Sequence, residues 1–321
     1  MTEAPDALRE AVLHEALTGL TSTPKTLPPW LFYDERGSQL FEAITALPEY
    51  YLTRTERAIF ARYAPQFPKH LISAVTIAEL GAGSASKTGI LLKEFTAAQP
   101  DLLYQPIDIS PTALDEAAAS IAEKIPGVRI EPQVANYITD RYNITRPDDH
   151  RVLALYIGSS IGNFTPEESI GILRNLRDHL QPGDTLLLGV DLAPGKHKPV
   201  ETLLAAYDDE AGVTAAFNKN ILTRLNRELN ADFNLDGFAH RARWNASASR
   251  MEMHLESLAE QTVFLAGERI HFAEGETIHT ENSHKFTEAS ILALLDASGF
   301  KLDITLHDDQ HRFAVVLAKA I

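Results

Sequence analysis

The stretch AELGAGSASKTGILL, residues 78–92, places two glycines between a short apolar run and a segment with helical periodicity. The apolar run begins at Ala74 and carries an acid, Glu79, just before Gly81 and Gly83. A strand followed by such glycines and then by a helix forms a loop in which the missing Cβ atoms let a ligand approach the main chain. The stretch therefore predicts a ligand-binding turn of a parallel α/β sheet.

The spacing around these glycines narrows the class of ligand. No GKS or GKT follows at the spacing of a phosphate-binding P-loop. The dinucleotide fingerprint G-x-G-x-x-G also fails, because Ser86 stands at its third glycine. Asp108 stands near the end of the next apolar run, PIDI, where an acid at the carboxyl end of a strand accepts hydrogen bonds from both hydroxyls of a ribose. The pattern favours a nucleoside whose other end is not a pyrophosphate.

Apolar runs alternate with amphipathic segments through the middle of the chain, which predicts an α/β fold with a parallel sheet. Near the C-terminus, a helix over 287–300 precedes the runs KLDITLHDD and HRFAVVLAKA, which should form an antiparallel hairpin. The expected strands span 74–80, 102–109, 128–135, 151–158 and 183–192, and the expected helices span 86–98, 111–125 and 166–180.

The α/β pattern is interrupted after residue 195, where polar helices give way to alternating stretches typical of antiparallel strands with one wet face. The first 55 residues carry two aromatic clusters, at 28–41 and 48–56, whose Pro and Gly content indicates loops between short helices. We therefore expect an inserted α+β domain. Its predicted parts are 8–55 and 196–286, and those of the α/β domain are 56–195 and 287–321.

The composition limits the kinds of partner that this protein can bind. The chain has 321 residues, 45% of them hydrophobic, no cysteine, and a formal net charge of -15, which repels nucleic acid and attracts cationic ligands. The polar N-terminus and the lack of a long apolar run suggest a cytoplasmic protein without a membrane segment. We expect a monomer. No metal site is predicted, because the spacing of His271, His279 and His284 shows no ligand pattern.

Taken together, Glu79 ahead of the glycines, the absent third glycine and the closing hairpin resemble class I S-adenosylmethionine-dependent methyltransferases, which have a Rossmann-like sheet. The resemblance implies S-adenosylmethionine as the cofactor, with Gly81 and Gly83 at its methionine end and Asp108 on its ribose. Lys87 is then either a partner of the cofactor carboxylate or a solvated helix lysine. Asn136 and Tyr137 stand at the position that such enzymes use around the adenine, with Asn in place of the usual Asp.

Four further stretches point to a substrate. Together they resemble the histidine-specific Nα-methyltransferase family, which catalyses the first step of ergothioneine biosynthesis. The stretches are GSSIGNF (158–164), LPEYYLTRTE, AYDDEAGVTAAFNKN and TENSHKF. The prolines that follow Asn or Asp in DNA amino-methyltransferases are absent after Asn163. The resemblance covers nearly the whole chain and implies that an amino acid is bound between the two domains.

That resemblance also implies the roles of individual residues. Tyr50, Asn163 and Tyr207 would hold the α-carboxylate and orient the α-amine, so Tyr50 and Asn163 are the expected catalytic residues. The imidazole would be recognised by Glu281 and Ser283, since residues two apart on a strand share a face. The remaining implied contacts are Gly158, Thr214, Phe217 and Met253 around the substrate and Tyr33 near the cofactor.

Three alternatives remain at this stage. The first is an Nα-methyltransferase of another aromatic amino acid such as tryptophan, which would not need a carboxylate at Glu281 because an indole has one N–H donor. The second is a non-catalytic protein that binds the cofactor or an amino acid. The third, a nicotinamide oxidoreductase, is disfavoured by Ser86.

Overall fold

The computed structural model describes residues 4–71, 73–83, 85–138, 140 and 142–321. The chain divides into two compact units, and each unit is built from two separate segments. Unit 1 comprises Met1–Tyr51 and Lys198–His284, and unit 2 comprises Leu52–His197 and Lys285–Ile321. Within the described residues, no helix combines the length and the apolar character that are needed to cross a membrane.

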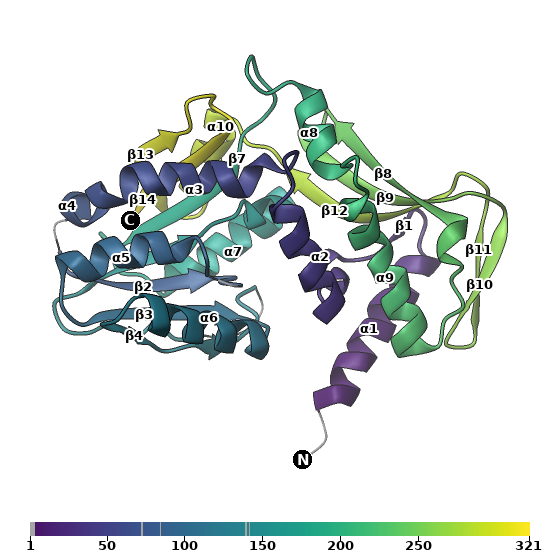
Figure 1. Cartoon of the computed structure of the whole chain (residues 1–321), viewed down its shortest axis with the longest axis horizontal. Coiled ribbons are helices and arrows are strands. Elements are labelled where there is room, and N and C mark those ends of the chain that lie inside the picture. Colours follow the sequence, from purple (N-terminus) through teal and green to yellow (C-terminus); the bar gives the residue numbers. More distant parts are fainter. Residues whose placement is uncertain (1–3, 72, 84, 139, 141) are drawn as a thin grey trace. The chain divides into compact units, whose positions relative to one another are not determined.

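Unit 2 is organised around an eight-stranded sheet with the order β13-β14-β7-β6-β2-β3-β4, in which β5 also pairs with β3 (Figure 1). Strands β2 to β7 in this sheet pair in parallel, whereas β14 runs antiparallel to β7 and to β13. The predicted α/β fold with a C-terminal hairpin is confirmed. The strands are β2 (Val75–Leu80), β3 (Leu102–Asp108), β4 (Val128–Ile130), β5 (Gln133–Val134), β6 (Arg151–Tyr156), β7 (Thr185–Asp191), β13 (Phe300–His307) and β14 (Phe313–Ala320).

Helices cover both faces of this sheet. Parallel strands are joined by right-handed crossovers, so α5 and α6 lie on one face, and α7, whose connection leads toward the other edge of the sheet, lies on the opposite face (Figure 1). Leu173 of α7 and Leu295 of α10 pack with the strands in the core of that second face. The segments are α3 (Tyr51–Tyr63), η2 (Ala64–Gln66), α4 (Phe67–Leu71), α5 (Thr88–Ala98), α6 (Pro111–Lys124), η3 (Ser160–Asn163), α7 (Pro166–Asp178) and α10 (Glu288–Ala297).

The sequence predicts these elements closely because their signals are local. Helix α7, for example, begins at a capping box in which Thr165 and Glu168 each accept a hydrogen bond from the other's backbone N–H. The single strand that was expected over 128–135 is wrong, because two short strands, β4 and β5, flank Pro132 instead. Proline has no N–H to donate to a neighbouring strand, so the ladder is interrupted there.

Unit 1 contains a four-stranded sheet with the order β1-β12-β9-β8 and a separate hairpin, β10-β11. Helices α8 and α9 pack against β8 and β9. The elements are α1 (Ala4–Thr21), β1 (Lys25–Thr26), η1 (Pro29–Phe32), α2 (Glu35–Thr45), α8 (Val200–Tyr207), α9 (Val213–Leu229), η4 (Leu235–Gly237), β8 (Phe238–Asn245), β9 (Arg250–Ser257), β10 (Gln261–Leu265), β11 (Glu268–Phe272) and β12 (Thr277–His284).

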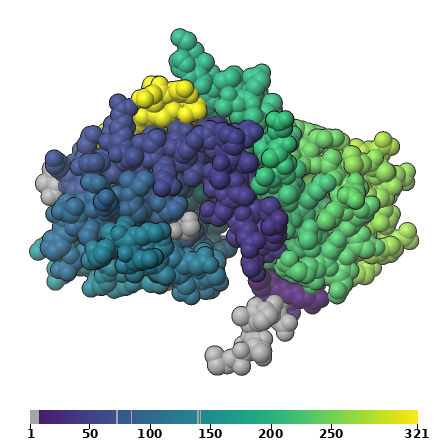
Figure 2. Space-filling model, viewed as in Figure 1, coloured from purple at the N-terminus to yellow at the C-terminus, as the bar shows by residue number. Residues whose placement is uncertain are grey.

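The N-terminal segment of unit 1 packs on residues that follow it by almost two hundred positions. Helices α1 and α2 both contact α9, and β1 adds a parallel edge to β12 with Lys25 opposite Ile278. In Figure 2 the purple N-terminal residues lie directly against the green residues of the later segment. The expectation of short helices is wrong at α1, which has 18 residues. Helix α2 begins at Glu35, and the side chain of the preceding Asp34 caps it by accepting a hydrogen bond from Gly37 N.

Candidate active site

The glycine turn after β2 exposes main chain as the sequence predicts. Gly81 and Gly83 have φ angles of +66° and +51°, in the left-handed region that favours glycine. A Cβ on Gly81 would lie 3.4 Å from the ring of Tyr137, whereas a Cβ on Gly83 would have no atom of the other described residues within 4 Å, its chain neighbours aside. The space above Gly83 is therefore open to a ligand that approaches the backbone.

Asp108 lies at the carboxyl end of β3, beside the glycine turn, because β2 and β3 are neighbours in the sheet. Its Oδ2 accepts a hydrogen bond from Gly83 N and its Oδ1 accepts one from Ser110 N, each at 3.0 Å. These bonds fix the half-buried carboxylate at the edge of the sheet. Each oxygen retains a second lone pair for a ligand hydroxyl.

Glu79 is fully buried below the turn and faces α5. Its carboxylate accepts a hydrogen bond from Thr88 Oγ1 at 2.7 Å and another from the Tyr104 hydroxyl. Burial raises the pKa of Glu79 to about 7, and the two hydroxyl donors oppose that rise only in part. Glu79 therefore joins β2, β3 and α5 beneath the turn.

Lys87, just before α5, forms an ion pair with Glu56 of α3. Glu56 is fully buried and also accepts the N–H of Gly158 at 2.9 Å. A Cβ at Gly189 of β7 would lie 2.0 Å from Glu56 Oε1, so the glycine makes room for this acid. No motif in the sequence singles out Glu56, although it is the last residue of the stretch LPEYYLTRTE.

The two residues expected around the adenine, Asn136 and Tyr137, lie in different surroundings. The ring of Tyr137 lies over Gly81 and 5.6 Å from the ring of Tyr156, so it lines the glycine turn. Asn136 uses its Oδ1 to accept the N–H of Ile138 at 3.1 Å, within its own turn. The amide nitrogen of Asn136 is the part of that side chain which this bond leaves for a ligand.

Gly158 and Asn163 follow β6, the neighbour of β2 on the side away from β3. Gly158 has a φ of +80°, and a Cβ there would lie 3.1 Å from Lys87 Nζ. Unit 2 thus gathers its predicted residues where parallel strands end, which is where ligands bind in open α/β sheets. They are Gly81, Gly83, Lys87, Asp108, Asn136, Tyr137, Gly158 and Asn163.

The other predicted residues lie in unit 1, among a group of aromatic rings. The ring of Phe217 on α9 lies 5.8 Å from Tyr33 and 6.0 Å from Phe41. Phe41 lies 6.4 Å from Tyr50, which in turn lies 6.3 Å from Tyr207. Tyr33 therefore belongs to the same unit as the predicted substrate residues, and 43% of it is exposed.

A β-bulge in β12 decides which way Glu281 and Ser283 point. His279 lies opposite His254 of β9, but Glu281 lies opposite Met253, so Thr280 is the extra residue. The bulge places Glu281 on the inner face of the sheet, where Met253 is buried. With regular alternation after His279, both Glu281 and Ser283 would lie on the opposite face.

Side-chain hydrogen bonds hold the inner face around the bulge. The Tyr207 hydroxyl donates to Ser283 Oγ at 2.7 Å, which joins the end of α8 to β12. Thr280 Oγ1 donates to Asn218 Oδ1 of α9 at 2.7 Å, and Asn218 Nδ2 lies 2.8 Å from His240 Nδ1. The sequence does not single out Asn218, His240 or Thr280, because no local spacing connects them.

Thr214 and Phe217 lie on α9, one turn apart and buried. The N–H of Thr214 donates to Asp209 Oδ1 at 2.7 Å, which fixes the start of that helix. Unit 1 therefore brings together Tyr33, Tyr50, Tyr207, Thr214, Phe217, Met253, Glu281 and Ser283 on elements that pack on one face of its sheet.

The two groups of residues fit different ligands. In unit 2, open backbone at Gly83 and a fixed acid at Asp108 fit a nucleoside with a polar tail. In unit 1, a carboxylate and a hydroxyl beside aromatic rings fit a small aromatic ring that carries nitrogen.

Comparisons with known proteins place the chain in a family. Residues 12–320 match the family described as "Histidine-specific methyltransferase, SAM-dependent", where SAM is S-adenosylmethionine. The chain is 41% identical to histidine N-alpha-methyltransferase of Mycolicibacterium smegmatis, over 98% of this chain and 97% of that protein. Its identity to the enzyme of the same name from Mycobacterium tuberculosis is 38%, over 98% and 96%.

A more distant relative has a different substrate in its name. The L-tryptophan methyltransferase trpM of Psilocybe serbica is 26% identical, over 98% of this chain and 93% of that protein. The match to the family model and the two mycobacterial relatives together lead to one conclusion: the chain belongs to the histidine-specific, S-adenosylmethionine-dependent methyltransferase family.

Proposed function

We propose that this protein transfers methyl groups from S-adenosylmethionine to the α-amino group of L-histidine until the nitrogen is trimethylated, which gives hercynine. This reaction is the first step of ergothioneine biosynthesis. The observation that carries the proposal is the bulge at Thr280, which turns both Glu281 and Ser283 toward the buried face of β12. An acid and an alcohol side by side on that face fit the two nitrogens of one imidazole.

Unit 2 is the proposed methyltransferase domain. S-adenosylmethionine supplies a methyl group that is already activated by the positive sulfur to which it is bound. Gly83 leaves room for the amino acid end of this molecule to approach the main chain, and Asp108 can accept its ribose hydroxyls. A net charge of -15 suits a cationic ligand.

Lys87 is already paired with Glu56, so its ammonium group would have to contact Glu56 and the carboxylate of S-adenosylmethionine at the same time. Glu56 is held in place by Gly158 N, so the ion pair keeps the lysine near Gly158. Tyr137 beside Gly81 would cover the adenine, and Asn136 would offer its amide N–H groups there.

Unit 1 is the proposed substrate domain. Glu281 would accept a hydrogen bond from one imidazole N–H, and Ser283, already bonded to Tyr207, would contact the other nitrogen. An indole has one N–H and needs no such pair. The ring of Phe217 and the side chain of Met253 would pack against the imidazole, with Thr214 one turn before Phe217 on α9.

The amino acid head requires a different kind of contact. Tyr50, Tyr207 and Asn163 would bind the α-carboxylate and orient the amine through phenol and amide groups, and the Tyr207 hydroxyl would then donate to the carboxylate instead of to Ser283. These groups hold a carboxylate without placing a fixed cation beside a nitrogen that becomes quaternary. The amine lone pair would form the new N–C bond while the S–C bond of the methyl donor breaks, and the rate would come from holding these atoms in line. Each methylated amine would release a proton to the solvent before the next transfer. Tyr33 would complete the aromatic surface near the methyl donor.

Predictions on domain boundaries, oligomeric state, location and partners accompany this function. The boundaries expected from the sequence for the two domains lie close to those of units 2 and 1, which supports assigning one role to each unit. A monomeric state, a cytoplasmic location and the lack of a nucleic-acid or membrane partner stay predictions from composition.

Mass spectrometry tests the proposal directly. The protein is incubated with S-adenosylmethionine and, in separate reactions, with L-histidine or L-tryptophan. We expect histidine to gain up to three methyl groups, with one equivalent of S-adenosylhomocysteine formed for each, and tryptophan to remain unmodified. Faster methylation of tryptophan would identify the alternative substrate, and no methylation of either would favour a non-catalytic binding protein.

A further inference from the structure

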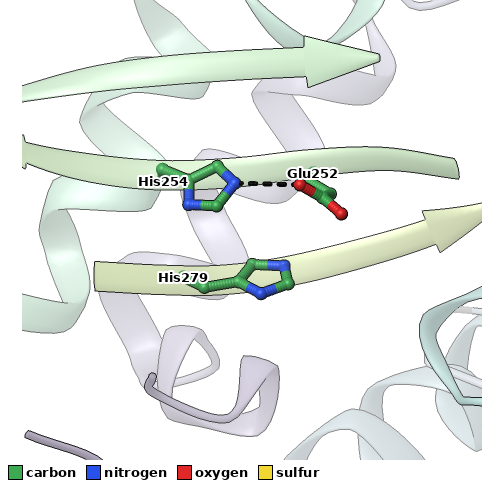
Figure 3. Close-up of side chains that lie close together, drawn as sticks. All are labelled: Glu252, His254 and His279. Atoms are coloured by element: carbon green, nitrogen blue, oxygen red, sulfur yellow. Dashed lines mark hydrogen bonds and ion pairs between the residues drawn. The ribbon is translucent and has the colours of Figure 1, made fainter. Parts of the chain in front are cut away.

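The outer face of the unit 1 sheet carries a cluster that the proposed reaction does not use. Glu252 and His254 lie two residues apart on β9 and therefore share a face, and His279 lies directly opposite His254 on β12. Figure 3 shows the three side chains side by side across the two strands. Glu252 and His254 flank Met253 on β9, so their side chains lie on the face of the sheet opposite to that of Met253 and Glu281. His279 shares the face of His254.

The three side chains are close enough to share one ion. Each offers one ligand atom, and these atoms all lie within 4.8 Å of one another. Glu252 Oε2 lies 3.2 Å from His254 Nε2, and the two imidazoles stack with ring centroids 4.6 Å apart. Ligand atoms around a tetrahedral zinc ion lie about 3.4 Å apart, so small side-chain rotations complete the site.

The surroundings fix Glu252 without using the oxygen that faces His254. Its Oε1 accepts hydrogen bonds from Asn245 Nδ2 at 2.9 Å and from Arg250 Nε at 2.8 Å. Metal-binding carboxylates are commonly held by such outer hydrogen bonds. The Arg250 cation opposes a metal ion nearby, but the carboxylate charge is shared between its two oxygens and Oε2 remains directed at the imidazole.

His254 gives an independent sign that the cluster is incomplete. The residue is 8% exposed, and its Nδ1 is buried without a hydrogen-bond partner among the residues that the structure describes. A buried polar atom without a partner is costly, and such atoms are uncommon in folded proteins. Coordination of a cation would let this imidazole reorient and use its lone pair.

We propose that Glu252, His254 and His279 form a binding site for a divalent transition metal ion of the Zn²⁺ class. Two imidazoles and one carboxylate are a donor set that zinc sites use with a fourth position open to water. Imidazole ligands select Zn²⁺, Co²⁺, Ni²⁺ or Cu²⁺ over Mg²⁺ and Ca²⁺, which prefer oxygen. A bound ion would tie β9 to β12 next to the bulge at Thr280.

The signal in the sequence is weak. Glu252 and His254 form a Glu-x-His pair on a strand, but His279 is distant in the chain, and the register of β9 with β12 is what makes it the third ligand. Along the chain, His279 stands nearest to His271 and His284, with which it forms no ligand pattern.

Calorimetric titration of the full-length, tag-free protein tests the site. The protein is first dialysed against a chelator and is then titrated with Zn²⁺ or Mg²⁺ without histidine, because free histidine binds zinc itself. We expect one Zn²⁺ per chain, no measurable Mg²⁺ binding, and a melting temperature that rises with Zn²⁺ concentration.

Matched variants locate the ion. His279→Phe keeps a ring against His254 but removes a ligand, and Glu252→Gln keeps an acceptor for Asn245 and Arg250. Each should weaken Zn²⁺ binding by about 100-fold or more, whereas His271→Phe, on the exposed part of β11, should leave it unchanged. Circular dichroism without metal checks the fold of each variant, and Glu252→Gln still decides the matter if His279→Phe does not fold. No Zn²⁺ binding, or binding that survives both ligand variants, would overturn the proposal.

Discussion

In unit 2 the proposed ligand residues follow strands that neighbour one another in the sheet, whereas in unit 1 they come from segments far apart in the chain. Gly83 and Asp108 belong to two consecutive β-α turns, and a hydrogen bond joins them directly. Tyr50 lies just before α3, Phe217 lies on α9 and Glu281 lies on β12, and Tyr50 comes near Tyr207 only when the N-terminal segment packs on the later one.

The difference shows how each half of the proposed site tolerates change. A turn at the end of a parallel strand is fixed by its own sequence and by the neighbouring strand. A side chain on an antiparallel strand depends on register, and one inserted residue moves it to the other face. We therefore expect changes in unit 1 to separate histidine binding from cofactor binding.

Replacement of both Glu281 and Ser283 by Ala should break this comparison most strongly. The double variant removes the carboxylate and the hydroxyl that lie on the inner face after the bulge at Thr280, so both proposed imidazole contacts are lost. Two hydrogen bonds to a polar ring correspond to about a 1000-fold loss of histidine affinity. Calorimetry with histidine measures it, and unchanged S-adenosylmethionine affinity in the same sample shows that unit 2 is folded. Normal histidine affinity in the double variant would show that these two side chains do not bind the imidazole.

Asp108→Ala is the corresponding change in unit 2. It removes the acceptor for the proposed ribose hydroxyls and releases the N–H groups of Gly83 and Ser110. We expect S-adenosylmethionine affinity to fall by about 100-fold, as measured by calorimetry. Asp115→Ala, on the exposed side of α6, is the matched control. Retained affinity in Asp108→Ala would remove this acid from the cofactor site.

Glu281→Gln sharpens the comparison within unit 1. The amide keeps the shape of the side chain but loses the charge that favours an imidazole N–H. The fall in kcat/KM for histidine should correspond to about 1 to 3 kcal/mol of lost transition-state stabilisation, mainly through a higher KM. Steady-state kinetics with saturating S-adenosylmethionine measure this fall. The exposed Glu268→Gln on β11 should behave as the unchanged protein does. Equal histidine kinetics in Glu281→Gln would exclude its role.

Glu79→Gln should have the smallest effect, and that effect depends on pH. Because the folded protein raises the pKa of Glu79 from 4.5 to about 7, the folded state binds this proton more tightly than the unfolded chain does. Its contribution to stability is complete below about pH 4.5 and is lost as the pH rises to about 7. As the pH rises from about 4.5 to about 7, the melting temperature of the unchanged protein should therefore fall relative to that of Glu79→Gln. A difference that does not vary with pH would contradict the raised pKa.

The sequence by itself determined the α/β fold, the C-terminal hairpin and the cofactor half of the site, because their signals are local. Alternating strands and helices, the glycine turn and the acid that ends β3 all lie within short windows. The sequence also predicted that Glu281 and Ser283 share a face, since they are two residues apart on one strand. Family resemblance, rather than spacing, singled out Tyr50, Tyr207 and Phe217.

Only the tertiary structure decided which face of β12 those two residues occupy, because a bulge is a property of the pairing between two strands. It also decided that Glu56 holds Lys87, that Asn218 supports the bulge, and that His279 meets His254. Each of these contacts joins residues that are distant in the chain. Composition and local periodicity contain no information on such pairs, because packing and strand register bring them together.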